Sequence, residues 1–364
     1  MKRRAWLLAA LVLLACAAFL MRRGESKEKP APVAHVDFPH YARPEEHKRN
    51  QERRTLPPPP VKDDTKEGYR QKRDPVMTAL PTTKGKSAMV FEAAALKDSP
   101  IGRLWLDCML SDRDARELDQ FKKEHGVDML NDVDRVAVSS QKVMILEGNF
   151  AGVHWDKPGQ VKRAYGTKGT IYATGDGEIG EKAIGTWGDG MQIVGDVKEI
   201  EAAIDRLEDR TPPEPPLIPE WSAYGDAYGV LSADDFAKIL PTSQRDIAER
   251  LRGALEQVEL HVDASDDVAI VADATGPTAT DVNDLGKTLG AALSLGRLKA
   301  QSDGDEKLAE LMELARVSPR DGRFSMELAL PMPLIQREMG PCKKRKDPAS
   351  GPSPGPSAPP KRGD

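Results

Sequence analysis

Apolar residues recur at helical spacing near the start of the central part of the chain. Asp98-Ser99-Pro100 offers capping side chains followed by proline, which predicts that a helix begins at Pro100. Ile101, Leu104, Trp105 and Cys108 then fall on one face of that helix. A second helix is predicted over 112–124, ending before Gly126.

Short apolar runs follow and predict a series of strands. They lie at 136–138, 143–146, 170–173, 183–184 and 191–194. Asp176-Gly177 and Asp189-Gly190 separate the last three, and Asp-Gly favours a tight hairpin turn. Asp196 and Glu199 then have the spacing of a capping box, which predicts a helix through Leu207.

The proline-rich stretch 211–219 divides the patterned part, and a similar order follows it. Strands are predicted at 228–231, 258–262, 268–271 and 324–330, and helices at 279–300, at 306–315 and after Pro333. Ile247, Leu251 and Leu255 mark one more helical face. Hairpins with helices set apart predict an α+β fold of antiparallel strands, in two similar lobes over 87–210 and 220–340, rather than a parallel doubly wound sheet.

The two ends of the chain have a different character. Residues 1–23 form a signal anchor or signal peptide: Lys2, Arg3 and Arg4 precede an uncharged stretch over 5–21, and Arg22-Arg23 follow it. Residues 24–86 are basic and proline-rich, and 341–364 are rich in proline and lysine. Neither shows apolar periodicity, so a disordered tether and a disordered tail are predicted.

Three outcomes are open for the first segment. Seventeen apolar residues reach about 25 Å as a helix, enough for a minimal membrane anchor. Alternatively, Leu13-Leu14-Ala15-Cys16 resembles a lipobox, which would make Cys16 a lipidation site, and Ala15-Cys16-Ala17 also fits simple signal cleavage. We favour the anchor because the apolar run continues past the cysteine. Each outcome places the rest of the chain outside the cytoplasm. We predict that it is anchored to the inner membrane, or to the outer membrane if the protein is a lipoprotein.

The uneven charge distribution narrows the range of partners. Residues 1–86 contain 19 Lys and Arg against 10 Asp and Glu, whereas 87–340 contain 28 against 46. The folded part is therefore strongly acidic, which argues against a nucleic-acid partner.

Few residues suggest chemistry. Glu259, His261 and Asp263 share one face of an alternating strand, where they form a polar cluster or a solvated strand face. Residues 175–180 match a dinucleotide fingerprint as a string, but the following pattern predicts a strand rather than the required helix. Cys108 lies on an apolar face and is predicted to be a buried thiol, with a bond to Cys342 left open. We therefore predict no catalytic residue, no cofactor and no metal site.

One resemblance is carried by the whole pattern. Its segments are 134–138, 143–150, 169–172, 185–187, 191–196 and 200–205, then 289–299, Val317 and 324–330. Over about 88–340 the order resembles uncharacterised exported or membrane-anchored proteins of myxobacteria and related bacteria. The resemblance implies class and compartment but no activity.

The sequence thus favours a membrane-tethered interaction or scaffold protein of the bacterial envelope. Its partners would be the membrane, through the anchor, and an unknown envelope or cell-wall component. The alternatives are a periplasmic ligand-binding or sensory domain, and a metal-dependent or hydrolytic enzyme that uses His261.

Overall fold

The computed structural model describes residues 73–109, 112–155, 160–174, 182–212, 214–239, 245–320 and 322–339. The strands before the proline-rich stretch are β1 (Ala88–Phe91), β2 (Val133–Ser139), β3 (Met144–Gly148), β4 (Gln160–Tyr165), β5 (Gly169–Thr174), β6 (Lys182–Trp187) and β7 (Met191–Asp196). Those after it are β8 (Ala227–Ser232), β9 (Gln257–Asp263), β10 (Val268–Thr275), β11 (Ala315–Arg320) and β12 (Arg323–Leu330).

The helices alternate with groups of strands. Before the proline-rich stretch they are α3 (Pro75–Ala79), α4 (Ala93–Asp98), α5 (Pro100–Met109), α6 (Asp112–His125) and α7 (Val197–Leu207). After it come the short 3-10 turn η1 (Glu220–Ser222), α8 (Ala233–Ile239), α9 (Arg245–Ala254), α10 (Ala279–Ser302), α11 (Glu306–Glu313) and α12 (Met332–Met339).

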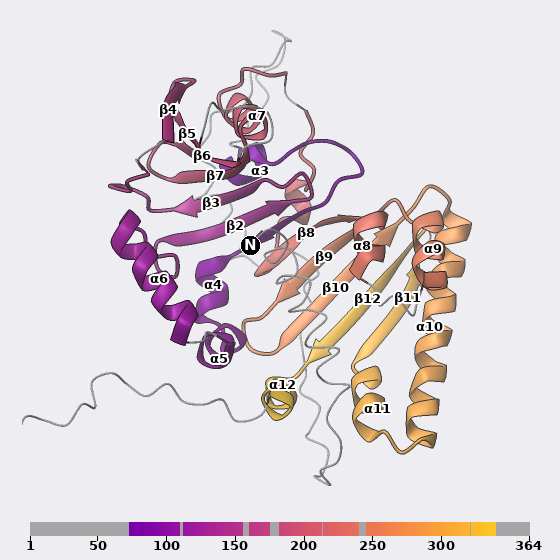
Figure 1. Ribbon diagram of the computed structural model, residues 1–364. Helices are drawn as coiled ribbons and strands as arrows, with labels where there is room; N and C mark the ends of the chain where they lie inside the picture. Colours follow the sequence, from indigo (N-terminus) through magenta and orange to yellow (C-terminus); the bar gives the residue numbers. More distant parts are fainter. Residues whose placement is uncertain are drawn as a thin grey trace, which may run out of the picture.

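All these strands join one sheet, in the order β11-β12-β10-β9-β8-β1-β2-β3-β7-β6-β5-β4 (Figure 1). Every neighbouring pair is antiparallel. The predicted α+β class with antiparallel strands is confirmed. The two lobes, however, are not shown as separate bodies, because β1 pairs with β8 and makes the sheet continuous across both halves.

Most predicted elements are present, with two kinds of error. The helix predicted at Pro100 begins there, and the Ser99 Oγ accepts a hydrogen bond from the Gly102 N–H at 3.1 Å. α7 also begins where predicted, but the side chain of Asp196 makes no capping hydrogen bond, so the capping box is wrong. The strands β1, β4 and β11 and the helices α3, α4 and α8 were not predicted.

Helices cover both faces of the sheet, and α4 and α6 pack on the same face as α10. α3 and α7 pack on one face, where their apolar side chains meet Val90, Ile145 and Tyr228. α9 and α10 pack on the other face, against Val258 and other residues of β9, β10 and β12. We call these the α7 face and the α10 face.

The long helix α10 approaches the α10 face closely (Figure 1). A Cβ atom added at Gly286 would lie 2.8 Å from the Cβ of Phe324, so only glycine fits without a shift. The glycine at this position therefore allows α10 to pack closely on the sheet.

The folded part extends beyond the boundaries that the sequence predicted. The range 24–86, predicted to be a disordered tether, includes α3, and Val76, Ala79 and Leu80 of this region are almost fully buried in the core. The predicted linker 211–219 also contacts the core, since Ile218 is 1% exposed. Apolar side chains in both stretches thus serve packing.

The predicted anchor, the tether up to residue 72 and the tail 341–364 lie outside the described residues. Within the described ranges, no helix is both long enough and apolar enough to span a bilayer.

Candidate functional site

A row of ionisable side chains crosses the middle of the sheet on the α7 face. Arg135 is paired with Glu147 in the β2–β3 register. The pairings of Phe91 with Val136 and with Ala227 place Glu92 beside Arg135 and Asp226. The pairing of Ala227 with Val262 places Asp263 next in line. We call Glu147, Arg135, Glu92, Asp226 and Asp263 the central polar row.

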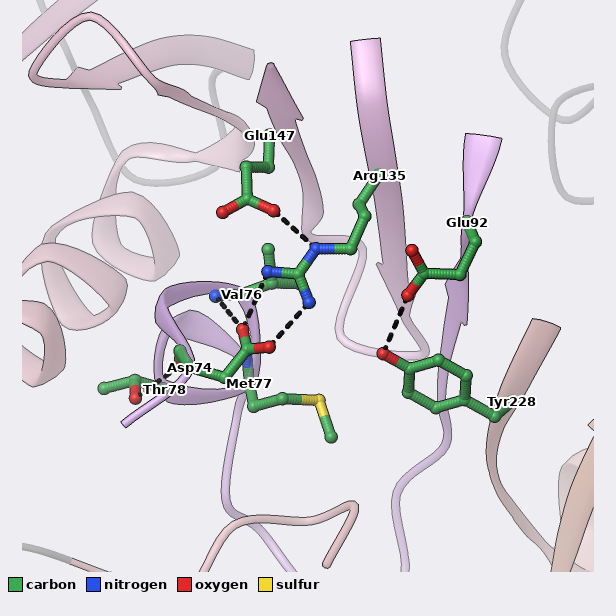
Figure 2. Close-up of polar contacts among 8 residues, drawn as sticks. All are labelled: Asp74, Val76, Met77, Thr78, Glu92, Arg135, Glu147 and Tyr228. Atoms are coloured by element: carbon green, nitrogen blue, oxygen red, sulfur yellow. Dashed lines mark hydrogen bonds and ion pairs between the residues drawn. The ribbon is translucent and has the colours of Figure 1, made fainter. Parts of the chain in front are cut away.

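Arg135 is the cation of this row and is 1% exposed (Figure 2). Its Nη1 and Nη2 donate to the two carboxylate oxygens of Asp74 at 2.6 and 3.0 Å, and its Nε donates to Glu147. Burial acts to lower the pKa of Arg135, but the charges and hydrogen bonds of Asp74 and Glu147 outweigh it and hold this pKa well above its ordinary value. Arg135 is therefore a permanent buried cation.

Asp74 has a second role at the start of α3. Its Oδ1 accepts hydrogen bonds from the N–H groups of Val76 at 2.8 Å and Met77 at 3.2 Å (Figure 2). Proline follows directly, so this is a side-chain cap with proline at the first helical turn. The ion pair with Arg135 thus fixes α3 to the sheet.

The other acids of the row accept from neutral donors. The Tyr228 hydroxyl donates to Glu92 Oε1 at 3.1 Å (Figure 2). The Ala264 N–H donates to Asp226 Oδ2 at 2.7 Å, and both the N–H and the hydroxyl of Ser265 donate to Asp263 Oδ1. Asp226 and Asp263 therefore organise the β9–β10 turn.

The sequence-predicted cluster lies beside this row. Glu259, His261 and Asp263 do share one strand face, but that face is buried, with exposures of 9%, 1% and 6%. The interpretation as a solvated strand face is wrong, because η1 and the chain that leads into β8 cover this part of β9. The structure brings Ser222 and Tyr224 of this covering segment onto His261.

His261 is held on three sides by that segment. The Ser222 Oγ lies 3.4 Å from His261 Nε2 and donates to Glu259 Oε2 at 3.1 Å. His261 Nδ1 lies 3.3 Å from the carbonyl oxygen of Tyr224, whose ring stacks on the imidazole with centroids 3.8 Å apart and planes 2° from parallel. A carbonyl oxygen can only accept, so Nδ1 of His261 carries a proton and donates it to Tyr224.

Burial is the main influence on both titrating groups of the cluster. It lowers the pKa of His261 and raises the pKa of Glu259, in each case because removal from water disfavours the charged form. Both shifts favour the uncharged form of the side chain.

The trio Ser222, His261 and Glu259 contains the residue types of a hydrolytic triad but not its arrangement. In a triad the carboxylate orients Nδ1 of the histidine, whereas here a backbone carbonyl does so and Glu259 accepts from the serine itself. Ser222 is fully buried, so a substrate has no access to its hydroxyl in this conformation. The geometry is that of a structural hydrogen-bond network.

Other sequence candidates have clear places. The string 175–180 lies outside the described residues, between β5 and its antiparallel neighbour β6. A pyrophosphate-binding helix N-terminus does not follow it. Among the described side chains, no group of three or more His, Cys, Asp or Glu is arranged to hold a metal ion.

The cysteines differ from expectation at one position. Cys108, predicted to be a buried thiol, is disulfide-bonded. The candidate lipidation site Cys16 lies outside the described residues.

Sequence reasoning missed Asp74 and Arg135, although each carried a signal. Asp74-Pro75 has the same cap-and-proline order that identified the helix at Pro100. Arg135 is two residues from each of the buried residues Val133 and Ala137 in β2. Because side chains alternate along a strand, this spacing puts Arg135 on the buried face. Ser222 and Tyr224 gave no periodic signal, because they belong to an irregular segment.

No family model, no curated protein and no solved structure matches this chain.

Proposed function

We propose that this protein is a membrane-tethered, extracytoplasmic interaction or scaffold protein of the bacterial envelope. The main support for an extracytoplasmic location is the disulfide at Cys108, because stable disulfides form in oxidising compartments and are rare in the cytosol. The sequence supports the same address through the basic and apolar segment at 1–23.

The described surface supports an interaction role. Large apolar side chains are exposed on the α10 helix, at Leu295 (67%) and Leu298 (58%), and on η1, at Trp221 (69%). Tryptophan is enriched among the residues that dominate partner binding, and the two leucines add exposed apolar area on one helix. The buried polar groups, by contrast, serve the fold.

We also propose that the two halves are similar lobes of one repeated plan. The order strand, helices, two strands occurs in β1 to β3 and again in β8 to β10. The first strands of the two sets, β1 and β8, are antiparallel neighbours, as expected for two units related by a two-fold axis.

The compartment can be tested with reporters fused after Asp364. Alkaline phosphatase is active only outside the cytoplasm, and an ordinary green fluorescent protein exported in unfolded form stays dark there. We expect an active phosphatase fusion and a dark fluorescent fusion, both in the membrane fraction after an alkaline carbonate wash. The reverse pattern would overturn the proposed address.

The alternatives are a periplasmic ligand-binding or sensory domain and an enzyme centred on His261. The closed position of Ser222 and His261 favours neither. The variant His261→Phe tests the enzyme alternative. If the role of His261 is structural, the variant should lose stability but keep its envelope localisation and its partner contacts.

A further inference from the structure

We propose that the outer edge of β4 binds an acidic, extended segment of a partner protein, which adds to the sheet as one more strand. The proposal deepens the proposed function, because it names a surface and a partner chemistry for an interaction protein, and it rests on that interaction role.

The two ends of the sheet differ in their capacity to accept another strand. β4 and β11 are the terminal strands, and Figure 1 shows them at opposite ends of the sheet. β11 contains Pro319, which has no N–H to donate, and Val317 of the same strand packs into the cluster under α10. β4 contains no proline, and among the described strands only β5 pairs with it. The outer backbone groups of β4 therefore offer the better template for a further strand.

β4 is accessible along most of its length. Residues 161–164 are all exposed, and Val161 is 52% exposed. An extended peptide that pairs with such an edge gains affinity from main-chain hydrogen bonds and specificity from alternate side chains.

Contacts with the end of α7 hold this edge in place. The Tyr165 hydroxyl donates to Asp205 Oδ2 at 3.2 Å. At the turn between β4 and β5, the Thr167 N–H donates to both carboxylate oxygens of Glu208, at 2.9 and 2.8 Å. A strand that is already ordered loses little conformational freedom when a partner pairs with it, so these contacts favour binding.

Charge selects the partner. The described residues of β4 to β6, at 160–174 and 182–187, contain no Asp or Glu but four cations: Lys162, Arg163, Lys168 and Lys182. Lys162 and Arg163 are adjacent in β4, so their side chains point to opposite faces of the sheet. Arg163 pairs with Glu201, and its side chain is still 51% exposed. A strand paired with β4 therefore meets a cation on each face, and acidic residues opposite these cations stabilise the pairing.

Other occupants fit this edge less well. A second copy of β4 would bring Lys162 and Arg163 close to the same two cations, and like charges opposite each other destabilise a pair of strands. The segments 1–72 and 340–364 of this chain contain more Lys and Arg than Asp and Glu. Because Val161 lies on the same face as Arg163, the best partner has two adjacent acidic residues and a β-branched residue nearby.

Peptide binding to the purified full chain tests the proposal. The probe is a fluorescein-labelled peptide of about ten residues, rich in valine and threonine, with two adjacent glutamates. One control peptide has two lysines in their place, and another has N-methyl groups on its central backbone nitrogens. Fluorescence anisotropy should show about tenfold tighter binding of the glutamate peptide than of the lysine peptide. N-methylation should abolish binding, because the methylated nitrogens cannot donate to β4.

Variants of the protein locate the binding edge. Lys162→Glu should weaken binding of the glutamate peptide about fivefold and strengthen binding of the lysine peptide. The matched control Arg316→Glu makes the same change of charge on β11 and should leave both affinities nearly unchanged. With the glutamate peptide bound, hydrogen exchange should slow in 160–165 and stay the same in 315–320.

Several outcomes would overturn the proposal. They are absence of binding, equal binding of the glutamate and lysine peptides, equal binding of the N-methylated peptide, and protection from exchange outside β4. A dimer in sedimentation velocity that the glutamate peptide disperses would show that a second copy occupies the edge. None of these results changes the reading of the fusion reporters, so the location of the protein and the partner at β4 fail separately.

Discussion

Loss of the Arg135 side chain should be among the most damaging single changes in this protein. Arg135→Met keeps most of the apolar stem but removes the guanidinium. The carboxylates of Asp74 and Glu147 then lose the cation that donates three hydrogen bonds to them. The side chains of Asp74 and Glu147 are 11% and 21% exposed, so water replaces the lost contacts poorly.

The magnitude follows from burial. Removing one member of a buried ion pair costs about 3–5 kcal/mol, because the remaining charge is left uncompensated. For a domain of this size that corresponds to a fall in melting temperature of about 6–20 °C. The matched control is Arg163→Met: its ion pair with Glu201 joins two more exposed side chains, so it should cost about 0–1 kcal/mol.

The assay is urea denaturation of both variants, monitored by tryptophan fluorescence and by circular dichroism. Asp74→Asn completes the set, since its amide oxygen can still accept from Val76 and Met77 while its charge is gone. A double-mutant cycle between Arg135→Met and Asp74→Asn should give a coupling energy above about 1.5 kcal/mol. Equal stabilities for Arg135→Met and Arg163→Met would refute the reasoning.

The remaining predictions concern titration and close packing. Because burial lowers the pKa of His261, its contribution to stability is complete above the unfolded-state pKa of about 6.5 and is lost as pH falls below it. His261→Phe should therefore flatten the stability profile below about pH 6.5. Because burial raises the pKa of Glu259, ionisation destabilises the fold as pH rises above the unfolded-state pKa of about 4.5. Glu259→Gln should therefore stabilise the fold at pH 8 and have little effect at pH 4, and an equal effect at both pH values would contradict this account. Gly286→Ala should cost about 1–3 kcal/mol by thermal denaturation, since the new methyl group meets Phe324, whereas Gly253→Ala in α9 meets nothing within 4 Å and should be stabilising by up to about 1 kcal/mol. Equal effects of the two alanines would show that close packing of α10 is not the cause.

The candidate site shows where sequence reasoning was sufficient. The alternation of β9 correctly put Glu259, His261 and Asp263 on one face, because side chains of a strand alternate whatever lies above them. It could not show that the face is buried. Burial depends on Ser222 and Tyr224, which reach His261 from a segment nearly forty residues earlier with no period of its own.

Prediction from local sequence also failed where tertiary contacts decide which of two similar capping residues forms its hydrogen bond. Asp196 has the type and spacing of a capping residue, yet its side chain makes no cap bond. Asp74 also stands directly before a helix, and there the cap forms. The same side chain is hydrogen-bonded to Arg135, which lies far away in the sequence. The sequence holds both signals, but only the fold selects one.

The sequence by itself determined the class of this protein: its helices and hairpins follow from periods of 3.6 and 2 and from Asp-Gly turns, which are local properties of the chain. Only the tertiary structure decided that the strands form one sheet, through the pairing of Ala88–Phe91 with Ala227–Val230 across more than a hundred residues. It likewise decided that α3 belongs to the core and that Arg135 and His261 are buried. The physical reason is that hydrogen bonds between distant strands and the burial of polar groups depend on which segments meet, and no local pattern records that.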